Sequence, residues 1–142
     1  MTVEIIKAVC RAIYEEFGEE YQIYTEAVPQ GLKTPCFFVS CIARFTDRAL
    51  CDRYLCTFPI AVQYIPRDSG NAKTECGEIA DRLFFTLDRI SVSGSPVNGT
   101  ELRCEPAEGL LNFFATYNMA AQRNREAVPK MEKIEITDNI KQ

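Results

Sequence analysis

The side chains that most often carry out chemistry are thinly represented in this sequence of 142 residues, which has no histidine. Histidine is the usual general base near neutral pH, a member of most catalytic triads and the commonest metal ligand. The remaining candidates for chemistry are seven cysteines, a few carboxylate pairs and a group of arginines. The composition therefore favours a structural or binding protein over an enzyme.

The cysteines show no spacing that is typical of metal or redox sites. Their positions are Cys10, Cys36, Cys41, Cys51, Cys56, Cys76 and Cys104. No Cys-x-x-Cys pair occurs, although zinc ribbons and redox motifs need that spacing. Most of them lie in apolar runs, which favours reduced thiols used as small core residues over disulfides or metal ligands. We therefore predict no metal site and no cofactor, and a protein that folds in a reducing cytoplasm.

The carboxylate pairs do not indicate a catalytic site either. Glu15 and Glu19, and also Glu75 and Glu78, have helical spacing and are typical of solvated helix faces. No glycine-rich phosphate loop, dinucleotide-binding glycine motif or Gly-x-Ser-x-Gly turn is present. A cysteine nucleophile would lack a histidine partner. A small cysteine- or carboxylate-dependent enzyme is therefore a minor alternative.

Charge is distributed unevenly along a chain whose formal net charge is −4. Residues 1–30 hold six acids and two bases, whereas residues 31–66 hold four bases and two acids. Four arginines gather around the first predicted hairpin: Arg44, Arg48, Arg53 and Arg67. Because the chain is acidic overall, pairing with nearby aspartates or with a neighbour is favoured over nucleic-acid binding. The asymmetry suits a subunit whose acidic face meets a basic face of its neighbour, with an ordinary solvated surface as the alternative.

The elements that must position these residues follow from apolar periodicity. Helical spacing predicts helices over residues 2–18 and 72–90, and a glycine inside the second helix, Gly77, suggests close packing. Strands are predicted at 21–25, 36–45, 50–65, 102–105 and 110–117, with a polar turn at 46–49 and a loop at 91–100. Pro59 would place the long strand at an edge, or mark a bulge or a split. Most phenylalanines follow the predicted core periodicities: Phe37, Phe45, Phe58, Phe84, Phe85, Phe113 and Phe114.

These elements predict an α+β fold in which two helices pack on a mostly antiparallel sheet of four to six strands. Residues 1–124 would form one domain, and residues 125–142 a C-terminal strand or extended arm. No apolar run reaches the roughly 20 residues that span a bilayer, and the N-terminus lacks the features of a signal peptide. We therefore expect no membrane association and no secretion by that route.

Two adjacent aromatic pairs are the strongest physical indication of function. A strand cannot hide both members of Phe37-Phe38 or of Phe113-Phe114 on one face. Helices on only one side of the sheet would leave Phe38 and Phe114 without cover, so a second copy of the chain is expected there.

At these residues the sequence resembles a family of small tail-terminator proteins from phages and prophages of Gram-positive bacteria. The order and spacing of several segments carry the resemblance over about residues 3–120: the N-terminal helix, Gln30-Gly31 with Pro35–Val39, Arg53-Tyr54 with Pro59, Glu75–Leu83 and Glu108–Tyr117. None of these segments is a catalytic signature.

The resemblance implies an α+β subunit of a homohexameric ring that caps the finished tail tube and ends its polymerisation. Its partners would be the tube protein, the sheath, and the neck or connector protein. The subunit would assemble in the bacterial cytoplasm and become part of a virion tail or of a contractile, phage-tail-like bacteriocin. In a phage, DNA would pass through the ring, where an acidic or neutral wall avoids sticking.

On this interpretation the candidate subunit contacts lie on the first hairpin, the acidic first helix and the aromatic pairs. They are Arg44, Arg48, Arg53, Glu15, Glu19, Phe38 and Phe114. The alternatives are a head–tail connector or another tail-completion protein, and a monomeric module that binds peptide or nucleic acid.

Overall fold

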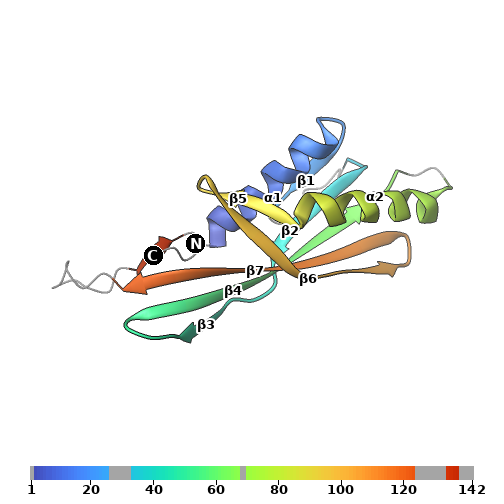
Figure 1. The fold of residues 1–142 in the computed structure, drawn as a ribbon. Helices are drawn as coiled ribbons and strands as arrows, with labels where there is room; N and C mark the ends of the chain where they lie inside the picture. The colour runs from blue at the N-terminus through green and yellow to red at the C-terminus, as the bar shows by residue number, and fades with distance from the viewer. Residues whose placement is uncertain (1, 26–32, 68–69, 124–133, 138–142) are drawn as a thin grey trace.

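The computed structural model describes residues 2–25, 33–67, 70–123 and 134–137. Two helices, α1 (Thr2–Phe17) and α2 (Ala72–Leu87), lie on one face of a curled sheet (Figure 1). The described residues form eight strands: β1 (Gln22–Tyr24), β2 (Cys36–Cys41), β3 (Phe45–Arg48), β4 (Arg53–Ile65), β5 (Arg89–Val92), β6 (Ser95–Ala107), β7 (Leu110–Arg123) and β8 (Ile134–Thr137). The predicted α+β fold, with two helices on a mostly antiparallel sheet, is confirmed.

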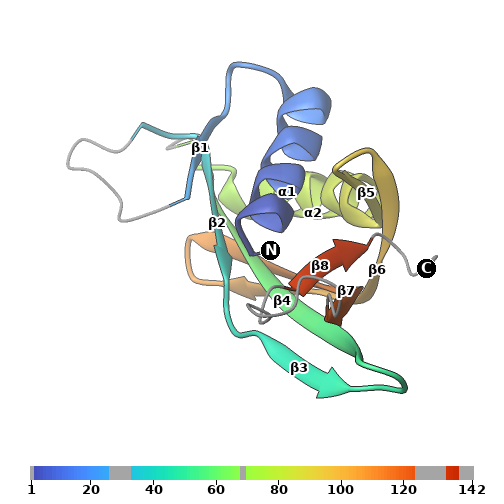
Figure 2. The same cartoon turned by 90° about the vertical axis from the view of Figure 1, so that its left-hand side faces the viewer.

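The sheet is built around two long strands. Its continuous path has the order β1-β2-β4-β7-β6-β5, in which β1 and β2 are parallel and the other neighbours antiparallel. β3 pairs with a stretch of β4 that lies beyond the end of β2, and β8 pairs in the same way with the end of β7 (Figure 2). β4 and β7 therefore extend past the strands that flank them at one end of the molecule.

The core lies between the helices and the inner face of β4 and β7. Alternate residues of β4 are buried from Cys56 to Tyr64, as expected of a strand with one covered face. Each helix contributes an apolar stripe at helical spacing, such as Ile5, Val9 and Ile13 on α1. Fully burying each of these side chains contributes about 1.5–3 kcal/mol to folding.

An aromatic cluster fixes the place where α1 ends and β1 begins. The ring centroid of Phe37 lies 4.9 Å from that of Phe17 and 4.9 Å from that of Tyr64. Gly18 ends the helix with φ +88, a conformation that few other residues adopt. The cluster attaches the end of α1 to the centre of the sheet.

Arg67 belongs to the start of α2 and not to the first hairpin. The Glu75 carboxylate accepts hydrogen bonds from the Tyr64 hydroxyl and from the Arg67 backbone N–H, the latter at 3.1 Å. The Arg67 guanidinium lies 3.6 Å from Glu20 and 3.8 Å from Glu75. The predicted group of four hairpin arginines therefore reduces to three.

Two predictions of irregular structure were wrong. Residues 45–48 are strand β3, whose four side chains are all exposed, because the chain bends at residues 42–44 and then pairs again with β4. Residues 91–100 form most of the β5–β6 hairpin, with its turn at Ser93 and Gly94, both at positive φ. The predicted second helix accordingly stops at Leu87, and Ile90 is buried in β5.

Three predicted core phenylalanines are exposed. Phe45 turns outward after the bend that precedes β3, and its exposed fraction is 57 %. Phe84 and Phe85 lie on the solvent side of α2, because the buried stripe of that helix is Cys76, Ile79, Leu83 and Leu87. Of the other predicted core positions, Phe37, Phe58 and Phe113 are buried, and Phe114 is half-buried.

Pro59 lies in a central and continuous strand. β2 pairs with β4 as far as Ile60, and β3 begins to pair at Thr57. Pro59 therefore faces the break between β2 and β3, where a missing backbone N–H removes no ladder hydrogen bond. Its carbonyl still accepts a hydrogen bond from the Ile42 backbone N–H at 2.9 Å.

Candidate assembly surfaces

The sequence-predicted contact residues lie on three separate surfaces. Arg48 and Arg53 lie on the β3–β4 hairpin and Arg44 directly precedes it, whereas Glu15 lies in the last turn of α1 and Glu19 just after it. Phe38 on β2 and Phe114 on β7 lie on the sheet face opposite the helices. The structure therefore does not bring the acidic and basic groups together within one subunit.

The β3–β4 hairpin carries apolar side chains that folding leaves in water. Leu50 at its tip has an exposed fraction of 80 %, and Leu55 and Phe45 are also exposed. The tip is nevertheless a defined turn, because Ala49 N–H donates to the Arg53 carbonyl at 2.7 Å and Arg53 N–H donates to the Leu50 carbonyl at 3.1 Å.

The backbone of the same turn adopts a conformation that few residues favour. Cys51 and Asp52 both have left-handed φ values, 53 and 63. Two consecutive residues of this kind are what a two-residue type I′ hairpin turn requires, and aspartate tolerates the conformation better than most residues. The turn places Cys51 and Asp52 at the tip, with Leu50 and Arg53 beside them.

Two hairpin arginines stack on their own sheet. The guanidinium carbon of Arg44 lies 5.7 Å from the Phe58 ring centroid, and that of Arg48 lies 5.3 Å from the Tyr54 ring centroid. Cation–π contacts of this kind leave the edge of the guanidinium able to meet a partner. Arg53 begins β4 on the alternate face, so the hairpin presents positive charge on both sides.

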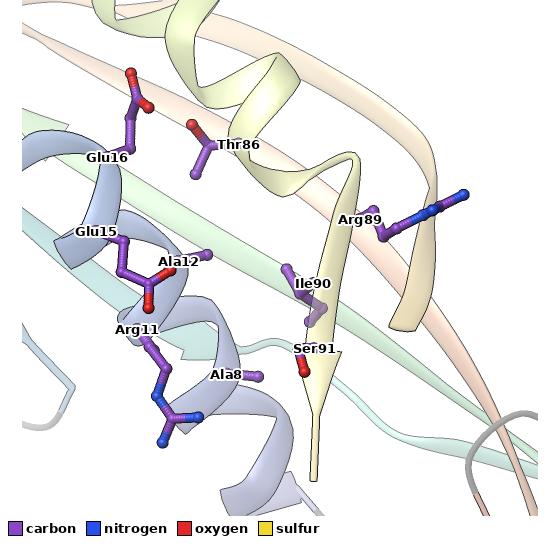
Figure 3. A pocket seen from close by; sticks show the side chains of 9 residues that line it. All are labelled: Ala8, Arg11, Ala12, Glu15, Glu16, Thr86, Arg89, Ile90 and Ser91. Carbon is purple, nitrogen blue, oxygen red and sulfur yellow. The ribbon is translucent and has the colours of Figure 1, made fainter. Parts of the chain in front are cut away.

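The acidic end of α1 borders an open cleft of about 530 Å³ between α1 and the junction of α2 and β5. Charged side chains of both signs line it, among them Arg11, Glu15, Glu16 and Arg89. Figure 3 shows Arg89 directed away from the two glutamates. The Thr86 hydroxyl donates to the Arg82 carbonyl at 2.7 Å. The cleft therefore suits a polar contact better than a reaction.

Most acids at this end of α1 already have partners in their own chain. The Arg82 guanidinium lies 3.1 Å from the Glu16 carboxylate and stacks 4.2 Å from the Phe17 ring centroid. Glu19 accepts a hydrogen bond from the Tyr14 hydroxyl at 3.2 Å. These contacts reduce the charge that α1 offers to a neighbour.

The outer sheet face has no helix over it (Figure 1). Phe37 and Phe113 are buried, whereas Phe38 and Phe114 are half-buried on the outer side, so each aromatic pair is divided between the faces as predicted. The Arg103 guanidinium covers the Phe114 ring at 4.3 Å and lies 3.0 Å from Glu105.

Polar pairs lie between the aromatic residues of this face. The Gln63 amide donates to Asn112 at 3.2 Å, and the Thr57 hydroxyl donates to Asn118 at 2.8 Å. The face thus combines apolar contact area with oriented polar groups, a combination that is typical of protein interfaces.

Sequence reasoning missed an apolar groove at the other end of the molecule. It has a volume of about 460 Å³ and lies between the first turns of α2 and the β6–β7 hairpin. Cys76, Gly77 and Ala80 line one wall, and Cys104, Pro106 and Leu110 line the other. A Cβ atom on Gly77 would meet nothing within 4 Å, so the expected close packing at this glycine was wrong. Small residues at helical spacing were the signal in the sequence.

The seven cysteines differ in how far they are exposed to solvent. Cys36, Cys56 and Cys76 are buried, as expected of small core residues, and all seven thiols are free. Cys51 at the hairpin tip and Cys104 in the groove are exposed. Burial raises the pKa of the Cys10 thiol to about 11, which keeps it protonated near neutral pH.

The described residues contain no group of three metal-ligating side chains, and none of the described helices is long and apolar enough to cross a membrane. A search of curated proteins finds no match to this chain. A family model described as phage tail terminator protein matches residues 4–129. Because this match spans most of the sequence, the chain belongs to the phage tail terminator family, a family of structural proteins that complete phage tails.

Proposed function

We propose that this protein is the subunit of a homohexameric ring that caps the tail tube, ends its polymerisation and presents a surface to the neck or sheath. The family supports the role in tail completion. The outer sheet face is the observation that carries the ring, because in a single copy of the chain the half-buried Phe38 and Phe114 lie on a face that no helix covers.

The proposed mechanism is geometric. One face of the ring matches the exposed end of the last tube ring, and the opposite face differs, so further tube subunits find no matching surface. Six equivalent modest contacts then act together, because each one raises the effective concentration of the next. No step requires proton transfer, which fits a chain without histidine.

The proposed contacts within and around the ring use the three surfaces described above. Arg44, Arg48 and Arg53 serve on and beside the hairpin, Glu15 serves on α1, and Glu19 serves in the turn that follows α1. Phe38 and Phe114 serve on the outer sheet face. Assembly would take place in the bacterial cytoplasm, and DNA would pass through the ring if the particle is a phage.

Native mass spectrometry combined with negative-stain imaging of the purified chain tests this proposal. We expect a closed ring of six copies that binds one end of preformed tail tubes and stops their growth. A stable monomer at micromolar concentration would overturn the proposal. A ring that binds the portal side and ignores tubes would instead indicate a head–tail connector.

A further inference from the structure

We propose that the β3–β4 hairpin tip of one subunit inserts into the apolar groove between α2 and the β6–β7 hairpin of the next. The occupant of the groove is thus a second copy of this chain, with Leu50 as the inserted side chain. This inference rests on the ring proposed above and names the contact that closes it.

The two surfaces lie at opposite ends of the molecule. In the β4–β7 ladder, Arg53 pairs with Gln122 at the tip end and Tyr64 pairs with Leu111 at the groove end. At about 3.3 Å per residue, the ladder separates the two sites by roughly 35–40 Å. Figure 1 shows the β3–β4 turn and the β6–β7 turn at the two ends of the sheet. A tip therefore cannot fill the groove of its own subunit.

The tip has the properties of an inserted group. Leu50 is the most exposed large apolar side chain at the hairpin, and the turn that carries it is fixed by two backbone hydrogen bonds. A rigid turn loses little conformational entropy when it binds, which favours association. Because Phe45 and Leu55 are exposed on the same hairpin, Leu50 belongs to a group of apolar side chains that folding leaves uncovered.

The groove has the properties of a receptor. Its walls are mostly apolar, and its volume of about 460 Å³ lies in the range of sites that accept several side-chain groups. The Cys104 and Pro106 wall belongs to the inner side of β6, which the helices leave exposed. On the opposite wall, Gly77 leaves the space above the α2 backbone open, because it has no side chain.

Charge complementarity selects this groove over its rivals. Residues 44–53, around the tip, carry three bases and two acids, for +1, whereas residues 101–110, in the β6–β7 hairpin, carry three acids and one base, for −2. Lys73, which lines the α2 wall, brings the surroundings of the groove to −1, still opposite in sign to the tip. A second apolar groove, beside α1 and β1, is bordered by Lys7 and Arg11 and would repel a basic hairpin. Of the acids at and just after the end of α1, Glu16, Glu20 and Glu19 already contact Arg82, Arg67 and Tyr14 of their own chain.

A tip at one end and a receptor at the other end produce a head-to-tail contact. Contacts of this kind generate closed rings when the rotation between neighbours closes, and open filaments when it does not. Each subunit then uses one tip and one groove, so every copy makes two equivalent contacts.

Paired variants test the contact in the full chain by native mass spectrometry. Leu50→Asp removes the inserted group, and Gly77→Phe fills the groove from an open position on α2. We expect each variant to lose the ring and to keep the far-UV circular dichroism spectrum of the wild type, which shows that the subunit still folds. The controls Phe85→Asp, which changes an exposed aromatic residue elsewhere on α2, and Gly77→Ala should keep the ring.

Mixing the two defective variants tests the direction of the contact. The Gly77→Phe chain keeps its tip and the Leu50→Asp chain keeps its groove, so an equimolar mixture should form heterodimers and nothing larger. A mixture that stays monomeric, or that restores full rings, would overturn the head-to-tail contact.

The two exposed cysteines provide a positional readout in the unmodified chain. Cys51 lies at the tip and Cys104 in the groove, so a short bismaleimide should link neighbouring subunits through these two thiols. We expect Cys51→Ser and Cys104→Ser each to abolish the cross-linked ladder, and Cys10→Ser to leave it unchanged. A ladder that survives either of the first two substitutions would contradict the proposal.

The outcomes separate this inference from the proposed function. If the wild-type chain forms no ring, the proposed function fails. If the wild type forms rings and either Leu50→Asp or Gly77→Phe forms them equally well, the groove contact fails and the ring stands. In that case a ring broken by Glu15→Lys would indicate α1 as the surface that the hairpin meets.

Discussion

The two ends of the long β4–β7 ladder differ in what their side chains contact. From Phe58 to Tyr64 every second residue is buried against the helices, and the rings of Phe37 and Tyr64 join α1 to the sheet. At the other end, all four residues of β3 are exposed and Leu50 extends into water. We call the two helices and the sheet they cover the body. The body derives its stability from burial, whereas the β3–β4 hairpin exposes apolar area that a single subunit does not bury. The comparison suggests that the body determines the fold and that the hairpin is kept for a partner.

The largest effect expected from this comparison concerns two phenylalanines. Phe37→Ala should lower the free energy of unfolding by about 3–5 kcal/mol, because it opens a cavity among the rings of Phe17, Tyr21 and Tyr64. The matched change Phe45→Ala, on β3, should alter it by no more than about 0.5 kcal/mol, since its side chain is exposed. Urea denaturation of both variants measures the difference. Similar losses in the two variants would show that β3 is part of the cooperative core.

Two glycines sharpen the comparison within the body. A Cβ on Gly99 would lie 2.7 Å from the Leu87 carbonyl oxygen, in the tight contact that joins β6 to the end of α2. We expect Gly99→Ala to destabilise the fold by about 1–3 kcal/mol, as overpacking does.

Gly77 provides the matched control for that substitution. It faces the open groove, so Gly77→Ala should raise stability by up to about 1 kcal/mol, because alanine favours the helix. Thermal unfolding by circular dichroism gives both values. A loss of stability in Gly77→Ala would mean that the groove is closed in the isolated chain.

A buried hydroxyl at the end of α2 gives a smaller effect. The Tyr117 hydroxyl donates to the Leu87 carbonyl at 2.7 Å, so Tyr117→Phe leaves that buried acceptor without this donor. The expected loss is about 1–2 kcal/mol of unfolding free energy. Tyr14→Phe removes a hydroxyl hydrogen bond to Glu19 at the exposed end of α1. It should change the free energy of unfolding by only about 0.2–0.5 kcal/mol. If chemical denaturation gives the same loss for Tyr117→Phe and Tyr14→Phe, the hydrogen bond of Tyr117 is exposed to solvent.

Most of the body could be predicted from periodicity. The stripes of α1 and α2 and the alternation in β4 depend on one buried face, so local pattern and tertiary burial agree. The division of the pairs Phe37-Phe38 and Phe113-Phe114 follows from the same alternation. At Phe45 the alternation of buried and exposed residues failed as a predictor. Nothing in the sequence marks the bend at residues 42–44, after which the side chain of Phe45 points to the outer face of the sheet.

The other errors arise from contacts between distant segments. Asn98-Gly99 has the composition of a turn, yet Gly99 lies in β6, where its missing side chain lets the Leu87 and Asp88 carbonyls approach. The groove depends on how α2 lies beside β6, which no local pattern encodes. The sequence could reveal the small residues of α2, whereas the opposite wall and the exposed tip at the far end required the structure.

The smallest expected effect is on thiol reactivity and leaves stability unchanged. Cys10 on α1 is partly buried, and desolvation raises the pKa of its thiol to about 11. At pH 8 only about one in a thousand of these thiols is the reactive thiolate. Cys51 at the hairpin tip is exposed, so it should react with iodoacetamide faster than Cys10 by roughly one to two orders of magnitude.

Peptide mapping by mass spectrometry after timed labelling gives both rates. The measurement uses the Gly77→Phe variant, whose tips are expected to be unoccupied, and labelling in denaturing urea provides the control, where the two rates should converge. Raising the pH should accelerate Cys10 up to about pH 11, because the thiolate fraction grows through that range. If Cys10 and Cys51 react equally fast in the native state at pH 8, α1 is not held against the sheet, and the distinction between a closed body and an open hairpin fails at that helix.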